Sequence, residues 1–291
     1  MSAGVRMVIL GTSQDGGVPQ AGCSCTRCHN ALENPKLRIH PTSCAIIGSD
    51  GSINLLEATR NLAEQLGIVS SVMGYRGSLA PDSVCITHFH LGHVDGLGQF
   101  GKEAMGVDSI PFFSSSKAMN VLENRDLSSP FEKNVVLPFV SFEPIGGCGF
   151  ELTLIPVPHR DEFSDTHAVL VNGPRLRVLF LPDHDNWVET LSLHESETIR
   201  DWLTKMEVDI ALLDGTFWDL TEIPNRIISE VPHPTISETI ELLGERKDGD
   251  PEIYFIHMNH SNPVLDKESG QSGVVRSKGW AVAEQCSVFP I

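Results

Sequence analysis

The sequence has no long hydrophobic run and few basic residues. No apolar segment approaches the roughly 18 residues that cross a membrane, and no basic stretch precedes an apolar one at the N-terminus, so we expect no signal peptide. The 291 residues include 21 lysines and arginines against 38 aspartates and glutamates, a net charge of -17. Because this surface repels phosphate backbones and anionic lipids, we expect neither nucleic acid nor a membrane as a partner.

Motifs of several common enzyme classes are also missing. There is no Gly-x-Ser-x-Gly nucleophile elbow. The glycine-rich stretch GTSQDGGVPQAG at residues 11–22 does not match G-x-G-x-x-G, and no phosphate-binding lysine follows it. We therefore assign it no organic cofactor and expect a tight loop. Asp15 in this loop is expected either to hydrogen-bond a ligand histidine or to cap a turn, and Cys85 is expected in the core.

Short β-branched runs closed by turn residues predict many strands. We expect them over residues 5–10, 43–48, 52–57, 83–87, 110–115, 150–158, 167–171, 177–182, 210–215 and 252–258. Helical periodicity predicts helices over residues 58–68, 94–106, 116–124, 196–207 and 235–246. The strands over residues 43–48 and 52–57 look like a hairpin that turns at SDGS. We therefore expect an αββα sandwich of two mixed sheets, with helices outside, in a single domain over residues 1–291.

The segment HFHLGHVDG at residues 88–96 holds three histidines in the spacing H-x-H-x-x-H. Two histidines two residues apart on an extended segment point the same way, and a third at a helix start can close on the same point. Imidazole binds zinc, iron, manganese and copper alike. We therefore expect His88, His90 and His93 to bind metal.

Other polar residues stand at the ends of predicted strands. His159 follows LIPVP, Asp183 follows VLFLP and His257 follows IYFI. Polar residues that end buried strands converge on one rim of a sheet, which suits a binding site better than a core. We expect these three residues to join the histidine motif as metal ligands.

Three of the seven cysteines crowd into the segment CSCTRC at residues 23–28. This spacing is too tight for disulfides among its own members, so it predicts a metal site in a protein of the reducing cytoplasm. Thiolates select zinc or an iron–sulfur cluster. We favour a structural zinc, for which three cysteines need a fourth ligand.

In this order, the motifs resemble the metallo-β-lactamase superfamily and, more closely, the family of coenzyme PQQ synthesis protein B. The likeness rests on LGTSQDGGVPQAGCSC, THFHLGHVDGLGQFGKEAMG, IPVPHRDEFSDTHAV, LFLPDHDNW, LLDGTFW, VPHP and YFIHMNHSNP. It implies a first metal position formed by His88, His90, His159 and Asp183. A second position would keep His93 and His257, with Asp183 as a bridge. The resemblance thus implies catalytic roles for Asp183, His93 and His257.

Gly92 stands where hydrolases of the superfamily place an aspartate. The PQQ-synthesis family is similar to this chain in having glycine there. The resemblance implies that the second position lacks an anionic ligand and binds metal more weakly, so Gly92→Asp is expected to tighten it.

A related phosphodiesterase family has a similar cysteine triplet, closed by the second histidine of a late H-x-x-H. Carried onto HMNH at residues 257–260, this implies a structural zinc held by Cys23, Cys25, Cys28 and His260. Other positions depart from the family pattern. His167 and His184 could add a ligand or a proton relay, and Glu57 is expected to line a different pocket.

Three functions follow from these features. The resemblance implies an iron-dependent oxygenase or hydroxylase acting on a small amino-acid or peptide-derived precursor in biosynthesis of a PQQ-like quinone. An open histidine-rich site with one carboxylate suits that chemistry. The alternative is a zinc-dependent hydrolase of phosphodiesters, esters or lactones, and the third is a non-catalytic binding module. The expected partners are a small-molecule or peptide-derived substrate and, at most, a second copy of the chain in a homodimer.

Overall fold

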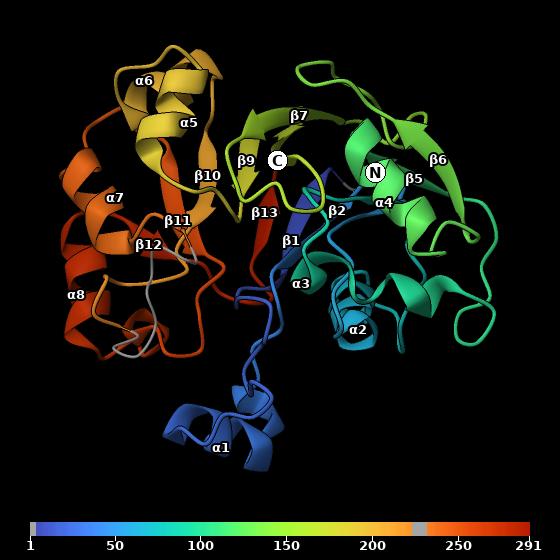
Figure 1. The fold of residues 1–291 in the computed structure, drawn as a ribbon, viewed down its shortest axis with the longest axis horizontal. Helices are drawn as coiled ribbons and strands as arrows, with labels where there is room; N and C mark the ends of the chain where they lie inside the picture. Colours follow the sequence, from blue (N-terminus) through green and yellow to red (C-terminus); the bar gives the residue numbers. More distant parts are fainter. Residues whose placement is uncertain (1–3, 223–231) are drawn as a thin grey trace.

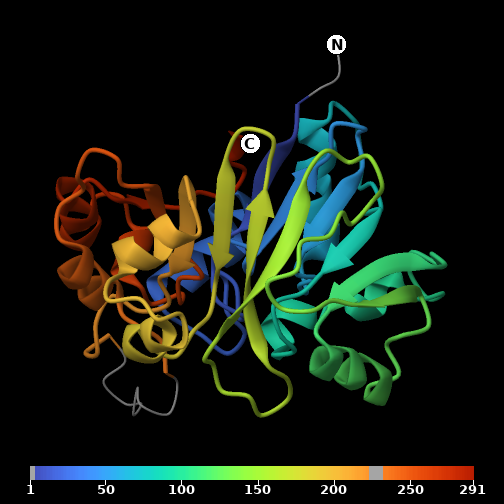
Figure 2. The same cartoon turned by 90° about the horizontal axis from the view of Figure 1, so that it is seen from above.

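Two mixed β-sheets lie face to face at the centre of the molecule (Figures 1 and 2). The computed structural model describes residues 4–222 and 232–291. The first sheet has the strand order β13-β1-β2-β3-β4-β5-β6 and the second β12-β11-β10-β9-β8-β7. The first sheet comprises β1 (Arg6–Gly11), β2 (Ser43–Ile47), β3 (Ile53–Leu56), β4 (Ser83–Cys85), β5 (Ile110–Ser114), β6 (Phe131–Val135) and β13 (Val288–Pro290). The second comprises β7 (Glu151–Val157), β8 (Thr166–Asn172), β9 (Arg177–Leu181), β10 (Ile210–Asp214), β11 (Glu252–Ile256) and β12 (Ala281–Val282).

The strand β1 shows how the sheets are packed on both faces. Its side chains alternate, as the two-residue period of a strand requires. Met7 and Ile9 belong to the core between the sheets, whereas Val8 and Leu10 pack with the helices outside the first sheet. A third core lies between the second sheet and its own helices.

Helices cover the outer faces of both sheets (Figure 1). The first sheet is covered by α2 (Leu62–Val72), α3 (Leu91–Val94) and α4 (Ser116–Asn124), and the second by α5 (Trp187–Leu193), α6 (Ile199–Lys205), α7 (Ile236–Leu243) and α8 (Gly270–Ser277). The helix α1 (Thr26–Glu33) projects from the sandwich. Single turns of 3₁₀ helix are η1 (Pro35–Leu37), η2 (Leu97–Phe100) and η4 (Pro263–Leu265). The expected αββα sandwich of mixed sheets is confirmed.

All ten predicted strands are present, and β2 and β3 form the expected antiparallel hairpin. Three short strands, β6, β12 and β13, were not predicted, nor were the helices α1, α5 and α8. The predicted helix over residues 94–106 is wrong, because only α3 and η2 form there. Glycines interrupt this segment, and at Gly96 a Cβ would lie 2.1 Å from the Thr59 carbonyl oxygen. No helix in the two described stretches is long and apolar enough to cross a membrane.

Candidate metal centre

The candidate site lies where strands of both sheets end. His88 and His90 follow β4, and His93 lies in α3, whose N-cap is His90. His159, Asp183 and His257 follow β7, β9 and β11 of the second sheet. The structure therefore gathers all six residues of the expected active site, with groupings of donor atoms within 4.8 Å of one another.

The first group of donors consists of His88, His90 and His159. His88 Nε2 lies 2.9 Å from His90 Nδ1. His159 turns its Nδ1 toward Asp185 Oδ1 at 3.1 Å, which leaves Nε2 for a metal. A carboxylate behind a histidine in this way fixes the ring orientation and the tautomer of a ligand.

The carboxylate of Asp183 lies between this group and a second one. Its Oδ2 is 2.7 Å from His93 Nε2 and 3.8 Å from His88 Nε2, and its Oδ1 is 3.3 Å from His257 Nδ1. Burial alone would raise the pKa of Asp183, but His257 and His93 hold it well below its usual range. An ionised carboxylate surrounded by imidazoles is a suitable donor to two metal positions at once.

Charge around His93 also favours a bound cation. Burial would lower its pKa, yet the carboxylates of Asp183 and Glu57 raise it well above the ordinary value. By contrast, burial and then His93 lower the pKa of His88 well below its ordinary value. The cluster therefore attracts positive charge while offering a neutral imidazole, and a divalent metal would replace the proton on His93.

Asp15 contributes a second carboxylate to this cluster. Its Oδ1 lies 3.4 Å from His257 Nε2 and 3.6 Å from His93 Nε2. Burial would raise the pKa of Asp15, but the two histidines lower it to about 2. Of the two roles expected for Asp15, its position agrees with an approach to the histidines.

The structure places a carboxylate in the space beside Gly92. A Cβ at Gly92 would lie 2.1 Å from Asp15 Oδ1 and 2.5 Å from Asp15 Cβ. The space beside Gly92 is thus already filled by a carboxylate, and Gly92→Asp cannot simply add a second one. The sequence could not reveal this contact because the two residues are far apart along the chain.

Two further residues near Asp183 had no assigned role. His233 Nδ1 lies 2.7 Å from Asp214 Oδ2 and 3.4 Å from Asp183 Oδ1, and all three side chains are buried. The sequence contained a signal for each of them, because His233 belongs to the VPHP motif and Asp214 lies at the end of a predicted strand. Val231, the first residue of that motif, lies outside the described residues.

Glu57 occupies a different place from the one expected. It is fully buried and accepts the backbone N–H of Thr87 at 3.0 Å, and its Oε1 lies 3.6 Å from His93 Nδ1. Glu57 therefore lies buried behind His93 and is not exposed at an open surface. Its position allows it to orient the His93 ring, as Asp185 does for His159.

His184 and His167 are not among the grouped donors of the described residues. His184 Nδ1 lies 2.8 Å from Thr190 Oγ1, and its ring packs against Trp187. Burial lowers the pKa of His184 to about 4, so it is neutral at physiological pH. Its ring packs against α5 and is not grouped with the donor atoms of the candidate metal positions.

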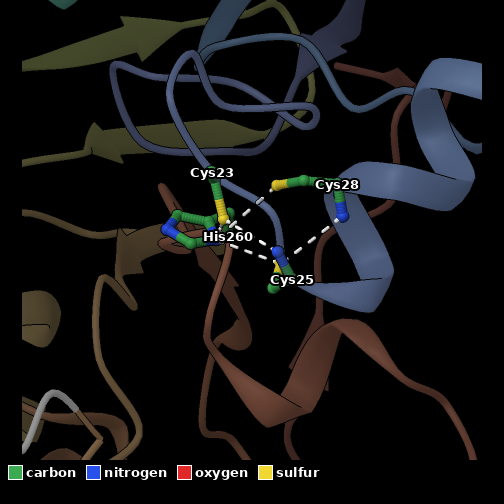
Figure 3. A group of neighbouring side chains, drawn as sticks. All are labelled: Cys23, Cys25, Cys28 and His260. Carbon is green, nitrogen blue, oxygen red and sulfur yellow. Dashed lines mark hydrogen bonds between the residues drawn. The ribbon is translucent and has the colours of Figure 1, made fainter.

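The three cysteines of the CSCTRC segment meet His260 as expected (Figure 3). His260 Nδ1 lies 3.6 Å from Cys23 Sγ and 3.7 Å from both Cys25 Sγ and Cys28 Sγ. A tetrahedral zinc with ordinary bond lengths separates its sulfur and nitrogen ligands by about 3.6 Å. The four side chains thus have the spacing of a closed zinc site.

Hydrogen bonds around the sulfurs agree with this interpretation. The backbone N–H of Cys25 donates to Cys23 Sγ at 3.4 Å, and that of Gln20 donates to Cys28 Sγ at 3.3 Å. Burial raises the pKa of Cys28 to about 12, so a thiolate there depends on a bound cation.

Asp185→Asn is expected to weaken metal binding by the first group about 10- to 100-fold, because an amide orients the His159 ring less well than a carboxylate. The measurement is a competition titration with cobalt(II) against a chelator. Asp248→Asn, in an exposed turn, is the matched control. Equal affinities for the two variants would contradict this role of Asp185.

Comparisons with known proteins agree with this geometry. Residues 72–258 match the model of the Beta-lactamase superfamily domain. Coenzyme PQQ synthesis protein B of Rhodopseudomonas palustris is 23% identical over 96% of this chain and 97% of its own length. The protein of the same name from Ruegeria pomeroyi is 26% identical over the same shares.

Solved structures share the fold. Zn(2+)-bound PqqB from Methylobacterium extorquens has a TM-score of 0.75 at 20% identity, over 98% of this chain and 100% of that one. A diphosphatase from the PhnP family has a TM-score of 0.67 at 20% identity, over 99% and 98%. With a family model matched over more than half of its length, the chain belongs to the β-lactamase superfamily, and it is similar to coenzyme PQQ synthesis protein B.

Proposed function

We propose that the chain is a metal-dependent hydrolase with two adjacent metal positions. The observation that carries this proposal is the place of Asp183, whose Oδ2 lies between His88 Nε2 and His93 Nε2. One carboxylate between two groups of imidazoles is suited to clamp two cations side by side. Membership of a superfamily whose fold typically serves metal-dependent enzymes supports the same conclusion.

The chain's own residues would divide the work as follows. His88, His90, His159 and Asp183 would hold the first metal, and His93 and His257 would share Asp183 with the second. Bound metal supplies Lewis acidity and lowers the pKa of water. Asp185 and Glu57 hold the His159 and His93 rings in place, and His233 stands beside Asp183, where it can hold a proton shared with Asp214.

The cysteine site has a separate, structural task in this proposal. Cys23, Cys25, Cys28 and His260 would hold a zinc that fastens the loop before α1 to the segment after β11. A closed set of four ligands leaves no open position for a substrate, which is typical of structural zinc.

An iron-dependent oxygenase or hydroxylase in the synthesis of a PQQ-like quinone is the second candidate. It is favoured by the relatives named coenzyme PQQ synthesis protein B, which match over nearly the whole chain. Its sequence-based support was a site with one carboxylate. Asp15 lies within 3.6 Å of both His93 and His257, and these two histidines and one carboxylate also form a set of the kind that holds iron(II) in oxygenases.

The test separates the two candidates by metal and by reaction. The protein is purified without oxygen, its metal content is measured, and it is assayed with bis(p-nitrophenyl) phosphate, p-nitrophenyl esters and lactones. Oxygen consumption is measured in parallel with tyrosine-containing peptides. We expect zinc-supported hydrolysis that a chelator abolishes. Hydrolysis at background level, together with iron-dependent oxygen consumption, would overturn the hydrolase proposal in favour of the second candidate.

A further inference from the structure

We propose that Asp15 is a direct ligand of the second metal position, and that Gly92 is glycine in this chain because it makes room for that carboxylate. The inference rests on the proposed two-metal function and adds a ligand from a loop of the first sheet. It gives the second position three donors that lie together, Asp15, His93 and His257, while Asp183 Oδ2 lies 2.7 Å from His93 Nε2.

The distances among the donors fit a single ion. Asp15 Oδ1, His93 Nε2 and His257 Nε2 form a triangle with the two carboxylate edges at 3.6 and 3.4 Å. Ligands at 2.0–2.2 Å from a tetrahedral metal lie about 3.4 Å from one another. His257 Nε2 has no hydrogen-bond partner among the described residues although it is buried. A metal in the triangle would satisfy it.

The backbone holds Asp15 in this place. The N–H of Gln14 donates to the Met258 carbonyl at 2.8 Å, and the N–H of Met258 donates to the Thr12 carbonyl at 2.9 Å. These two hydrogen bonds fasten Thr12 and Gln14, just before Asp15, to the residue after His257. A site whose ligands are fixed by the backbone is preorganised for its metal.

A turn-capping role does not explain the position of the side chain. The turn after Asp15 is closed by the backbone N–H of Gly17, which donates to the Gln14 carbonyl at 2.8 Å. The carboxylate instead faces His93 and His257.

Gly92 is the steric counterpart of Asp15. Any side chain at residue 92 would begin 2.1 to 2.5 Å from the Asp15 carboxylate and its Cβ, closer than atoms can approach. Since Asp15 is hydrogen-bonded into place through its neighbours, glycine is the residue that fits. Asp15 therefore supplies a carboxylate in the space that a side chain at residue 92 would occupy.

The experiment is zinc titration of the metal-free whole chain, with bound metal counted by mass spectrometry and affinity measured by calorimetry. We expect about three zinc ions per wild-type chain, one at the cysteines and two at the active site. Asp15→Asn is expected to bind about two, with the affinity of the lost site down at least about 100-fold, since even an outer partner of a ligand is worth 10- to 100-fold. Asp108→Asn, in the exposed loop before β5, is the matched control.

Two variants of Gly92 sharpen the test. Gly92→Ala alone is expected to displace Asp15 and lose the same zinc ion. In an Asp15→Gly background, Gly92→Ala should have no further effect, because the clash is gone. Asp15→Gly combined with Gly92→Asp should regain the third zinc ion, since the new carboxylate enters the space that Asp15 leaves. Circular dichroism checks that each variant is folded.

The outcomes are distinguishable. Full zinc stoichiometry and affinity in Asp15→Asn would overturn the role of Asp15 while leaving the hydrolase proposal in place. Independent, additive effects of Asp15→Gly and Gly92→Ala would overturn the steric account. A wild-type chain that binds zinc only at the cysteines would overturn both this inference and the proposed function.

Discussion

Asp183→Ala is expected to abolish turnover while the sandwich still folds. The variant removes the carboxylate that lies 2.7 Å from His93 Nε2 and 3.3 Å from His257 Nδ1. It leaves the histidines without the negative charge that holds two cations together. Because metal activation is worth several kcal/mol of barrier, we expect kcat/KM to fall on the order of 10³-fold or more.

The measurement for Asp183→Ala combines hydrolysis rates with metal content and a thermal unfolding curve. Both active-site zinc ions should be weakened, whereas the zinc at the cysteines should remain. Asp248→Asn serves as a charge-matched control on the surface. A variant that keeps wild-type turnover with full metal content would show that Asp183 is not the bridge.

Cys25→Ser is expected to have the largest effect on stability. It removes one of the three sulfurs that lie within 3.7 Å of His260 Nδ1, and three remaining ligands do not close a zinc site. Zinc binding to a folded site is folding free energy. A loss of about 3 to 5 kcal/mol would lower Tm by roughly 10 °C.

Cys286→Ser provides the control for this variant, because Cys286 is also exposed and lies outside the cysteine cluster. We expect it to keep the zinc content and the Tm of the wild type. Equal zinc content and equal Tm for Cys25→Ser and the wild type would contradict the structural zinc.

The interior strands of both sheets could be read from the sequence, whereas three edge strands could not. Strands such as β9 and β10 are almost wholly buried and appear as apolar β-branched runs. The missed strands β6, β12 and β13 each lie at the end of a sheet. Edge strands are short and half exposed, so β6 reads as the polar segment FEKNV and carries no alternating pattern.

The candidate site likewise contains residues that could be predicted from the sequence and residues that could not. Residues at the ends of recognisable strands, such as His159 and Asp183, could be predicted because strand ends meet at one rim. Asp15 and Gly92 could not be paired, since their contact depends on how a loop of the first sheet folds back beside α3. His233 was missed because it precedes a helix and follows no predicted strand. Only the spatial arrangement shows it beside Asp183 and Asp214.

The backbone hydrogen bonds between residues 12–14 and Met258 couple metal binding at the two candidate centres. One segment carries Asp15 and the cysteine ligands, and the other carries His257 and His260, so each segment reaches both centres. Metal bound at one centre would restrain a segment that also carries ligands of the other centre. Such linkage is reciprocal, so zinc at the cysteines should raise the active-site affinity by the same factor as the reverse. We therefore expect the two candidate centres to acquire and lose metal cooperatively.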